Sequence, residues 1–218
     1  MKYRILTAIA GVALVASSAS AQVCQGDLSF RGRPTHVAGA FGVTDHTTNF
    51  GGGLNFGHTD GLFGGGSLGF TDYDALNGSS LVLGGGVGYA MPIGNRSPWQ
   101  VCPGATLGLG FGPSIDNGVG GSEHFSSQTF TAGASIGRVL PVNKDFSLLP
   151  FGSAAIGHTS QRISNVGSAS DTYLLLGFGA GLQFSPSWVI RPSISVAAGA
   201  DIIDDTVFGL SLSWALPR

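Results

Sequence analysis

Bulky apolar residues and very small residues alternate along most of this chain. In the glycine-rich stretch between residues 49 and 70, Phe50, Leu54 and Phe56 share one face of an extended strand, while glycine and asparagine occupy the other face. After the turn-forming residues 58–61 the same alternation resumes. Because successive side chains of a strand point to opposite faces, this period of two predicts a β-hairpin.

The same period recurs to the end of the chain and predicts about ten strands of about ten residues each. The predicted strands cover residues 36–43, 49–56, 64–71, 81–91, 99–111, 129–138, 146–157, 172–184, 188–196 and 207–216. For the stretch 146–157 the pattern does not decide which face points inward. A phosphate-binding glycine loop leads from a strand into a helix, and no segment has a helical period, so we expect no nucleotide site.

The connections between the predicted strands alternate in length. Residues 58–61, 92–98, 141–145 and 185–187 form short connections, whereas residues 112–124 and 158–171 form the longest ones. Short turns at one end and longer loops at the other are typical of outer-membrane barrels.

Charged residues are rare, at 10% of the chain, whereas ordinary soluble domains contain about 25%. Mean hydropathy is +0.29, and within the predicted strands only Arg138 and Arg191 are charged. A soluble sheet that exposed the face of small residues would have uncharged, unprotected edges and would aggregate. A closed barrel in a membrane turns the bulky face to lipid and pairs every backbone group. We therefore predict an all-β fold: a closed, antiparallel, up-and-down transmembrane β-barrel of about ten strands, with eight as the alternative.

The first residues have the pattern of a cleaved signal peptide. Lys2 and Arg4 precede an apolar run over residues 5–15, and Ala19 and Ala21 form a small-residue cleavage site. We expect a signal peptide over residues 1–21, a periplasmic N-terminal segment over residues 22–33 and the barrel over residues 34–218. No later stretch is long and apolar enough for a transmembrane helix.

Aromatic residues gather at the two ends of the predicted strands, as they do at the two interfaces of a bilayer. The periplasmic girdle would contain Trp99, Trp188, Trp214, Tyr89, Phe56 and Phe184. The opposite girdle would contain Phe41, Phe50, Phe70, Phe111 and Phe208.

With this strand pattern and signal peptide, the mature chain resembles the small outer-membrane β-barrel proteins of the OmpA-transmembrane-domain and OmpX-like kind. The resemblance implies a multi-pass outer-membrane protein with both termini in the periplasm. It also implies contact with membrane lipid, lipopolysaccharide and the outer-membrane assembly machinery. Two features depart from the family: its barrels usually have eight strands, and its last residue is usually aromatic, whereas here Ala-Leu-Pro-Arg follows Trp214.

Cys24 and Cys102 are the two cysteines of the chain. Export into an oxidising compartment favours a disulfide between them, with two buried thiols as the alternative. Two soft ligands without a nearby histidine pair do not make a metal site.

Acidic residues mark the predicted outer connections, and they favour a structural, interaction or adhesion role toward an extracellular ligand or surface. They are Asp45, Asp72, Asp74, Asp116, Glu123, Asp171, Asp201, Asp204 and Asp205. Asp201, Asp204 and Asp205 are the candidate cluster for a divalent cation, since carboxylates suit Ca²⁺ or Mg²⁺. We expect no cofactor and no nucleic-acid partner.

Two alternative functions follow from other residues. His158 and Ser160 form an H-x-S pair similar to that of lipid A deacylase barrels, with Asp171 or Glu123 as candidate acid. The Gly/Ala/Ser lining of the lumen is compatible with narrow-pore transport of small solutes. Four side chains would obstruct such a pore: Phe63, Tyr173, Gln183 and Arg191. We do not expect an enzyme.

Overall fold

The structure is a computed structural model, and it describes residues 23–28, 30, 34–58, 60–74, 78–94, 98–116, 122–164, 167–203 and 206–217. The predicted signal peptide lies outside these residues. Within the described residues, no helix is long and apolar enough to cross a membrane.

Ten long antiparallel strands form the fold of the described chain. They are β1 (Thr35–Val43), β2 (Thr47–Gly57), β3 (Leu62–Tyr73), β4 (Gly78–Tyr89), β6 (Trp99–Asp116), β7 (Ser122–Arg138), β9 (Ser147–Ile163), β10 (Gly167–Ser185), β11 (Trp188–Ala198) and β12 (Thr206–Ala215). The two-residue strands β5 (Met91–Pro92) and β8 (Leu140–Pro141) pair with β6 and β9. A 3-10 helix, η3 (Val23–Gln25), precedes the sheet.

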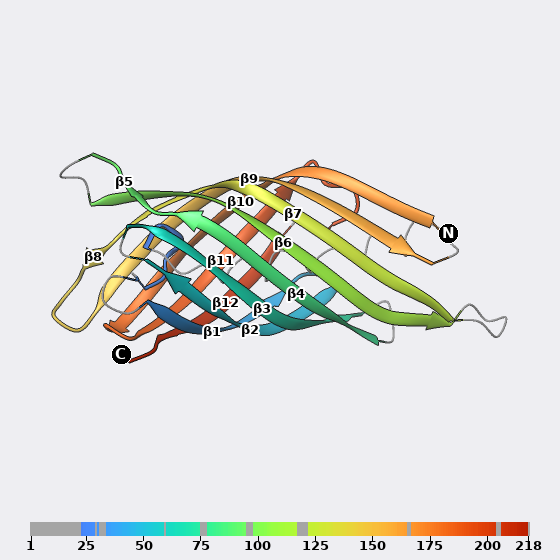
Figure 1. Ribbon diagram of the computed structural model, residues 1–218, viewed down its shortest axis with the longest axis horizontal. Coiled ribbons are helices and arrows are strands. Elements are labelled where there is room, and N and C mark those ends of the chain that lie inside the picture. The colour runs from blue at the N-terminus through green and yellow to red at the C-terminus, as the bar shows by residue number, and fades with distance from the viewer. Residues whose placement is uncertain are drawn as a thin grey trace.

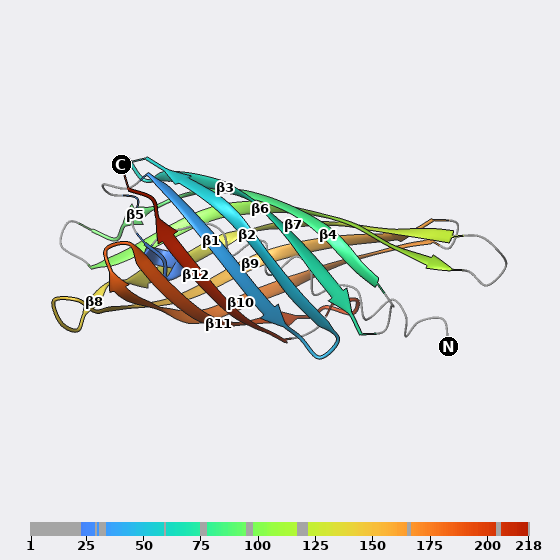
Figure 2. The same ribbon diagram turned by 90° about the horizontal axis from the view of Figure 1, so that it is seen from below.

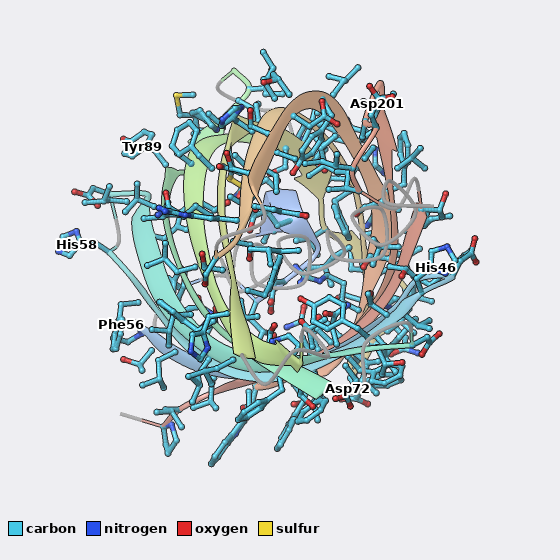
Figure 3. All side chains as sticks on the ribbon, turned by 90° about the vertical axis from the view of Figure 1, so that its right-hand side faces the viewer. His46, Phe56, His58, Asp72, Tyr89 and Asp201 are labelled. Carbon is cyan, nitrogen blue, oxygen red and sulfur yellow. A yellow bond between two sulfur atoms is a disulfide. The ribbon has the colours of Figure 1, made fainter. Side chains whose placement is uncertain are left out.

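The sheet closes on itself (Figures 1 and 2). Each long strand pairs with the next one along the chain, and β12 pairs with β1 from His36↔Ala215 to Val43↔Phe208. Figure 3, which views the molecule along its long axis, shows the strands as a ring around the lumen. Closure leaves no sheet edge around the ring, as a bilayer requires. The predicted ten-stranded barrel is thus confirmed.

Bulky apolar side chains cover the outside of the barrel, as the alternation predicted. Phe56, Val87 and Phe208 are 54%, 64% and 58% exposed, and Figure 3 shows Phe56 and Tyr89 pointing away from the ring. Glycine, alanine, serine and threonine dominate the inner face. The undecided stretch is now resolved: in β9, Ile156 is exposed and Leu149 is buried. Such an exterior is solvated by acyl chains.

Four strands are longer than predicted. β6, β7, β9 and β10 have 18, 17, 17 and 19 residues, whereas the other six have between 9 and 12. The predicted long loops over residues 112–124 and 158–171 are therefore wrong, because β6–β7 and β9–β10 continue through most of both stretches. The apolar alternation of the outer face ends where lipid contact ends, but the backbone ladder continues above it with polar side chains on that face.

Candidate functional site: the plugged lumen and the projecting hairpins

The N-terminal segment lies inside the barrel. Figure 3 shows it in blue within the ring, and Figure 2 places it at the end of the barrel that also holds the C-terminus. Cys24, Asp27, Leu28 and Phe30 are almost completely buried there. We call residues 23–28 and 30 the N-terminal plug.

One anchor of the plug is covalent. Cys24 forms a disulfide with Cys102, which lies on the inner face of β6. The predicted disulfide is present in the structure, and no described cysteine is free.

Polar anchors hold the plug to the opposite side of the ring. Arg191 of β11 donates from Nη1 to the Gln25 carbonyl oxygen at 2.9 Å and from Nε to Ser211 Oγ at 3.1 Å. Ser213 of β12 donates to Asp27 Oδ2 at 2.7 Å. A buried guanidinium and a buried carboxylate are tolerated because each is hydrogen-bonded and their opposite charges lie in the same region.

Apolar and aromatic contacts also hold the plug against the strands. Phe30 stacks on His36 of β1 with ring centroids 4.3 Å apart, and the Phe63 ring of β3 lies 6.3 Å away. Leu28 packs with Val189 and Ala215. The plug therefore contacts strands all around the ring.

Several glycines of the inner face make room for the plug. A Cβ atom at Gly137 would lie 2.6 Å from the Val23 carbonyl oxygen, and one at Gly181 would collide with the Gly26 carbonyl. A Cβ at Gly57 would collide with the Phe30 ring. Only glycine permits the backbone of the plug to approach these strands so closely.

A cavity of about 110 Å³ lies next to the plug. Its polar lining comes from Gln25 of the plug and from Thr106, Thr131, Ser135 and Ser153 of the strands. The hydroxyl group of Ser135 is buried and has no hydrogen-bond partner in the structure. The cavity is roomy and polar enough to hold several water molecules.

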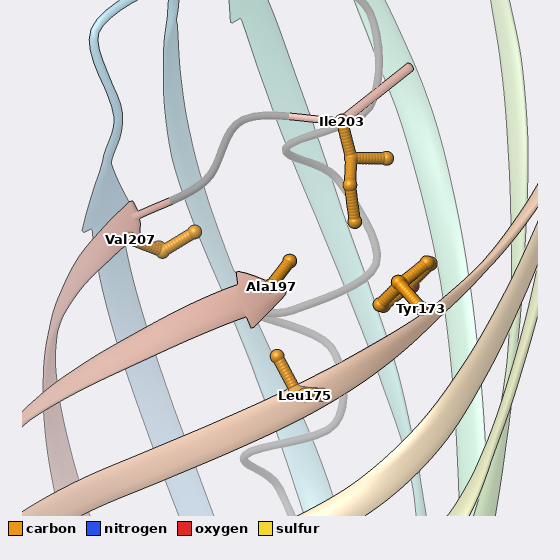
Figure 4. Packing of buried hydrophobic residues seen from close by; sticks show 5 residues of the cluster. All are labelled: Tyr173, Leu175, Ala197, Ile203 and Val207. Atoms are coloured by element: carbon orange, nitrogen blue, oxygen red, sulfur yellow. The ribbon is translucent and has the colours of Figure 1, made fainter. Parts of the chain in front are cut away.

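An apolar cluster lies on the inner face of β10–β12 toward the other end of the barrel, where the described residues of the β11–β12 connection fold inward. Ile203 packs with Tyr173, Leu175, Ala197 and Val207 (Figure 4). Asp171 Oδ2 accepts hydrogen bonds from the backbone N–H groups of Asp201 at 2.6 Å and Ile202 at 3.4 Å.

The side chains expected to obstruct the lumen mostly face it. Phe63, Tyr173 and Arg191 are each 3% exposed, and Gln183 is half-buried.

The candidate hydrolase residues are not brought together. His158 and Ser160 share the outer face of β9, and the nearest described partner of His158 Nδ1 is Thr172 Oγ1 at 2.9 Å. Asp171 lies on the inner face of β10, so it cannot orient His158 across the sheet. The Glu123 side chain lies outside what the structure describes.

The candidate cation ligands are described only in part. Asp201 is exposed, and Asp204 and Asp205 lie outside the described residues. Among the side chains that the structure places, no three His, Cys, Asp or Glu residues are grouped to hold a metal ion.

The predicted girdle residues lie at the strand ends and on the outer face. Trp188 stacks on Trp214 with ring centroids 5.5 Å apart, Phe50 stacks on Phe70 at 5.6 Å, and the Arg138 guanidinium lies 5.3 Å from the Trp99 ring centroid. The full set is Phe41, Phe50, Phe56, Phe70, Tyr89, Trp99, Phe111, Phe184, Trp188, Phe208 and Trp214.

Beyond the apolar band, the hairpins β6–β7 and β9–β10 project as a polar sheet (Figure 1). The last apolar outer positions include Phe130 and Ile156, and Ser126, Gln128 and Arg162 follow above them. The sequence prediction did not include this sheet, although two short runs keep a period of two: Ser127, Thr129 and Thr131, and Ser168, Ser170 and Thr172.

No protein-family model and no curated protein matches the sequence. Among solved structures, the chain is similar to the β domain of the Bordetella autotransporter BrkA, with TM-score 0.55 and 12% identity over 84% of this chain and 98% of that one. The KdgM porin gives TM-score 0.42 with 9% identity over 84% and 99% of the two chains. Ail of Yersinia pestis gives 0.40 with 17% identity over 82% and 91%. The first similarity shows the fold, and the two weaker ones add nothing to it.

A closed antiparallel barrel with a lipid-compatible exterior and the fold of an autotransporter β domain is an outer-membrane β-barrel. The chain is therefore an outer-membrane β-barrel protein.

Proposed function

We propose that this outer-membrane barrel is closed at rest and that its β6–β7 and β9–β10 hairpins form a cell-surface binding site for another protein. The observation that carries the proposal is the extension of these four strands past the apolar band, with polar side chains such as Ser126, Gln128 and Arg162 on the outer face. A strand needs only about 9–11 residues to cross a bilayer, so the remaining residues serve another purpose than spanning it.

The orientation follows from the construction of outer-membrane barrels, which keep short turns in the periplasm and send longer excursions outside. The projecting hairpins lie at the end of the barrel opposite the C-terminus and the plug (Figure 1). We therefore place them at the extracellular surface and the described C-terminal residues on the periplasmic side.

Within the part of the chain that the structure describes, no strand pairs with either outer edge of the projecting sheet. β10 pairs with β9 along residues 167–173, but its pairing with β11 starts only at Leu174↔Ala198. Likewise, the pairing of β6 with β4 ends at Leu81↔Phe111, while β6 continues to Asp116. Free strand edges present unpaired N–H and C=O groups that an extended peptide can add to.

The β10 edge is the better binding site of the two. Its residues Gly167, Ser168, Ala169 and Ser170 have small side chains, which allow a second backbone to approach within ladder distance. The partner that suits this edge is an extended segment of another protein, recognised mainly through its backbone.

A peptide selection tests the proposal directly. The protein is embedded in nanodiscs and probed with a phage library of random ten-residue peptides, and we expect peptides to be enriched. Proline is then placed singly at Ala169 and Ser170. Because backbone N–H groups alternate in direction along a strand, one of these two variants loses a donor of the free edge and the other a donor to β9. We expect the first to lose peptide binding with the barrel still folded.

Two results would contradict the proposal. One is that no peptide is enriched; the other is that both proline variants bind the selected peptides as the wild type does. The orientation has a separate readout: a Ser168→Cys variant in intact cells should react with a membrane-impermeant maleimide. The added thiol should be compared with Ser187→Cys at the opposite end of the barrel, which we expect to stay unlabelled.

A further inference from the structure

We infer that the N-terminal plug is a displaceable gate that closes an anion-conducting pore, and that Arg191 sets the ion preference of that pore. This goes beyond the proposed binding role of the projecting hairpins, and it does not depend on that role.

First, the barrel does not need the plug for its closure. The ladder from β1 to β12 is continuous and closed, and no ladder pairing joins a strand to the described residues of the plug. The plug's own backbone bond, from Gly26 N to the Val23 carbonyl, is internal. Its described contacts with the strands include one disulfide, side-chain hydrogen bonds and apolar contacts. Displacing it would leave every strand pairing intact.

Second, the lumen beside the plug is not filled by side chains. The cavity of about 110 Å³ is bounded on one side by Gln25 and Cys102 and elsewhere by small strand residues such as Gly104, Thr106 and Gly133. A barrel interior of bulky side chains is a packed core, whereas a hydroxyl-lined void with an unpartnered Ser135 Oγ is hydrated. The plug therefore separates a hydrated lumen from the periplasmic mouth.

Third, the barrel wall contributes the positive charge where wall and plug meet, and the plug contributes the groups that compensate it. Arg191 belongs to the barrel wall, while two groups that compensate it, the Gln25 carbonyl oxygen and the Asp27 carboxylate, belong to the plug. When the plug leaves, Arg191 keeps its hydrogen bond to Ser211 and loses the contact with Gln25 and the neighbouring carboxylate.

Among the described strand side chains that face the lumen, the other charged one is Asp171, which lies at the far end and caps the β11–β12 connection. An arginine at the mouth of a narrow pore attracts anions and repels cations.

Two substitutions should displace the plug while leaving the strand pairings of the barrel unchanged. Gly26 has φ +73°, and an added Cβ would collide with the Phe151 ring and lie 3.1 Å from the Leu149 carbonyl oxygen. Gly26→Val therefore clashes inside the seat, and its position takes no part in the strand ladder. Combined with Cys102→Ser, it also releases the covalent anchor and leaves the Cys24 thiol as a reporter of plug position.

The experiment compares Cys102→Ser with Cys102→Ser/Gly26→Val, each refolded and checked for heat-modifiable gel mobility. We expect the Cys24 thiol to be protected from a water-soluble maleimide in the first protein and to react in the second. In planar bilayers under a KCl gradient, we expect the wild type to stay closed and the double variant to give conductance steps with a reversal potential on the chloride side. Adding Arg191→Gln should shift that reversal potential toward zero.

Arg138→Gln is the matched control, because Arg138 lies near the same end of the barrel but stacks on Trp99 at the outer face. It should leave the reversal potential unchanged. If Cys24 stays protected in the folded double variant, the proposal that the plug is a gate is wrong. If Cys24 reacts while no conductance steps occur, the proposal that the lumen is a pore is wrong. Equal effects of Arg191→Gln and Arg138→Gln would overturn the role of Arg191. None of these results changes peptide binding at the β10 edge, so the two proposals fail separately.

Discussion

The two sides of the barrel wall differ in height. The tall wall consists of β6, β7, β9 and β10 with 17–19 residues each, and the short wall consists of β11, β12 and β1–β4 with 9–12. At about 3.3 Å per residue, the tall wall has roughly 20 Å more strand. The short wall has the length that a bilayer requires. The extra residues of the tall wall are therefore not needed to cross the bilayer, whereas the residues of the short wall are.

The two walls also differ in charge beyond the membrane. At the outer end of the short wall, Asp45, Asp72 and Asp201 are exposed. The outer face of the projecting sheet instead carries hydroxyl and amide groups together with Arg162. Among the described side chains, the exposed acidic residues thus belong to the short wall, and a partner that meets the outer face of the projecting sheet meets neutral polar groups and Arg162.

An arginine scan along β7 tests where the membrane ends on the tall wall, and it has the largest expected effect. Ala132 lies on the outer face within the apolar band, and Gln128 lies on the same face four residues along the strand. Ala132→Arg should lower the free energy of unfolding by about 2–4 kcal/mol, as arginine does near the bilayer midplane. Gln128→Arg should change it by less than about 0.5 kcal/mol, as on a water-exposed surface.

Equilibrium unfolding from liposomes in guanidinium chloride measures both values. Equal costs at the two positions would mean that lipid also surrounds the projecting sheet, and the division between the walls would be wrong.

The plug is anchored differently to the two walls, covalently to β6 and by hydrogen bonds to β11 and β12. Replacing both cysteines by serine should cost about 2–4 kcal/mol, because the disulfide closes a long loop in the unfolded chain. Ser213→Ala removes the donor to Asp27 and should cost about 1.5–3 kcal/mol, the range for hydrogen bonds to charged groups. The same unfolding measurement applies, and a larger cost for Ser213→Ala would identify the short wall as the main anchor.

Inside the barrel, each wall has a hydrogen-bonded set of neutral side chains. On the short wall, Thr71 donates to Asn49 Oδ1 at 2.6 Å; on the tall wall, Thr159 Oγ1 lies 3.0 Å from Thr129 Oγ1 and 3.2 Å from the Tyr173 hydroxyl. Thr71→Val should cost about 1–3 kcal/mol, because it leaves a buried amide oxygen unpaired.

Thr159→Val should cost about 0.5–1.5 kcal/mol, because the remaining hydroxyl groups can rotate toward other acceptors. The reverse order of the two costs would show that the upper interior of the tall wall is the less adaptable of the two.

The same contrast between walls explains what the sequence could predict. Where side chains face lipid, Phe50, Leu54 and Phe56 alternate with small residues, and strand, face and register follow from that pattern. Where the tall wall leaves the membrane, Ser126 and Gln128 need not be apolar, so the alternation of large and small residues no longer marks the strand. The projecting sheet was consequently mistaken for loops.

The position of the plug inside the barrel was not predicted, for a different reason. The N-terminal segment has no regular alternation of apolar and polar residues, so its sequence indicates no strand or helix. The position of the plug depends on contacts with residues far along the chain, such as Arg191 and Ser213. Two signals were present nonetheless: a cysteine eleven residues before the first strand, and an arginine in a strand that otherwise avoids charge. Some glycines of the inner face, including Gly137 and Gly181, lie against the backbone of the plug, and the strand pattern gave no sign of this contact.

The smallest predicted effect concerns the tryptophan pair of the short wall. Trp188 and Trp214 are cross-strand partners in β11 and β12, and their rings are stacked 5.5 Å apart with an interplanar angle of 10°. A double-mutant cycle with alanine should give a coupling energy of about 0.5–1.5 kcal/mol, the range for aromatic pairs beyond their area burial. Both rings lie at the end of the barrel opposite the projecting hairpins, where Trp and Tyr prefer the bilayer interface. The interface favours each ring separately, so it contributes to the two single variants and cancels in the cycle. A coupling near zero, with large single costs, would therefore show that the two rings act as independent interface anchors rather than as a pair.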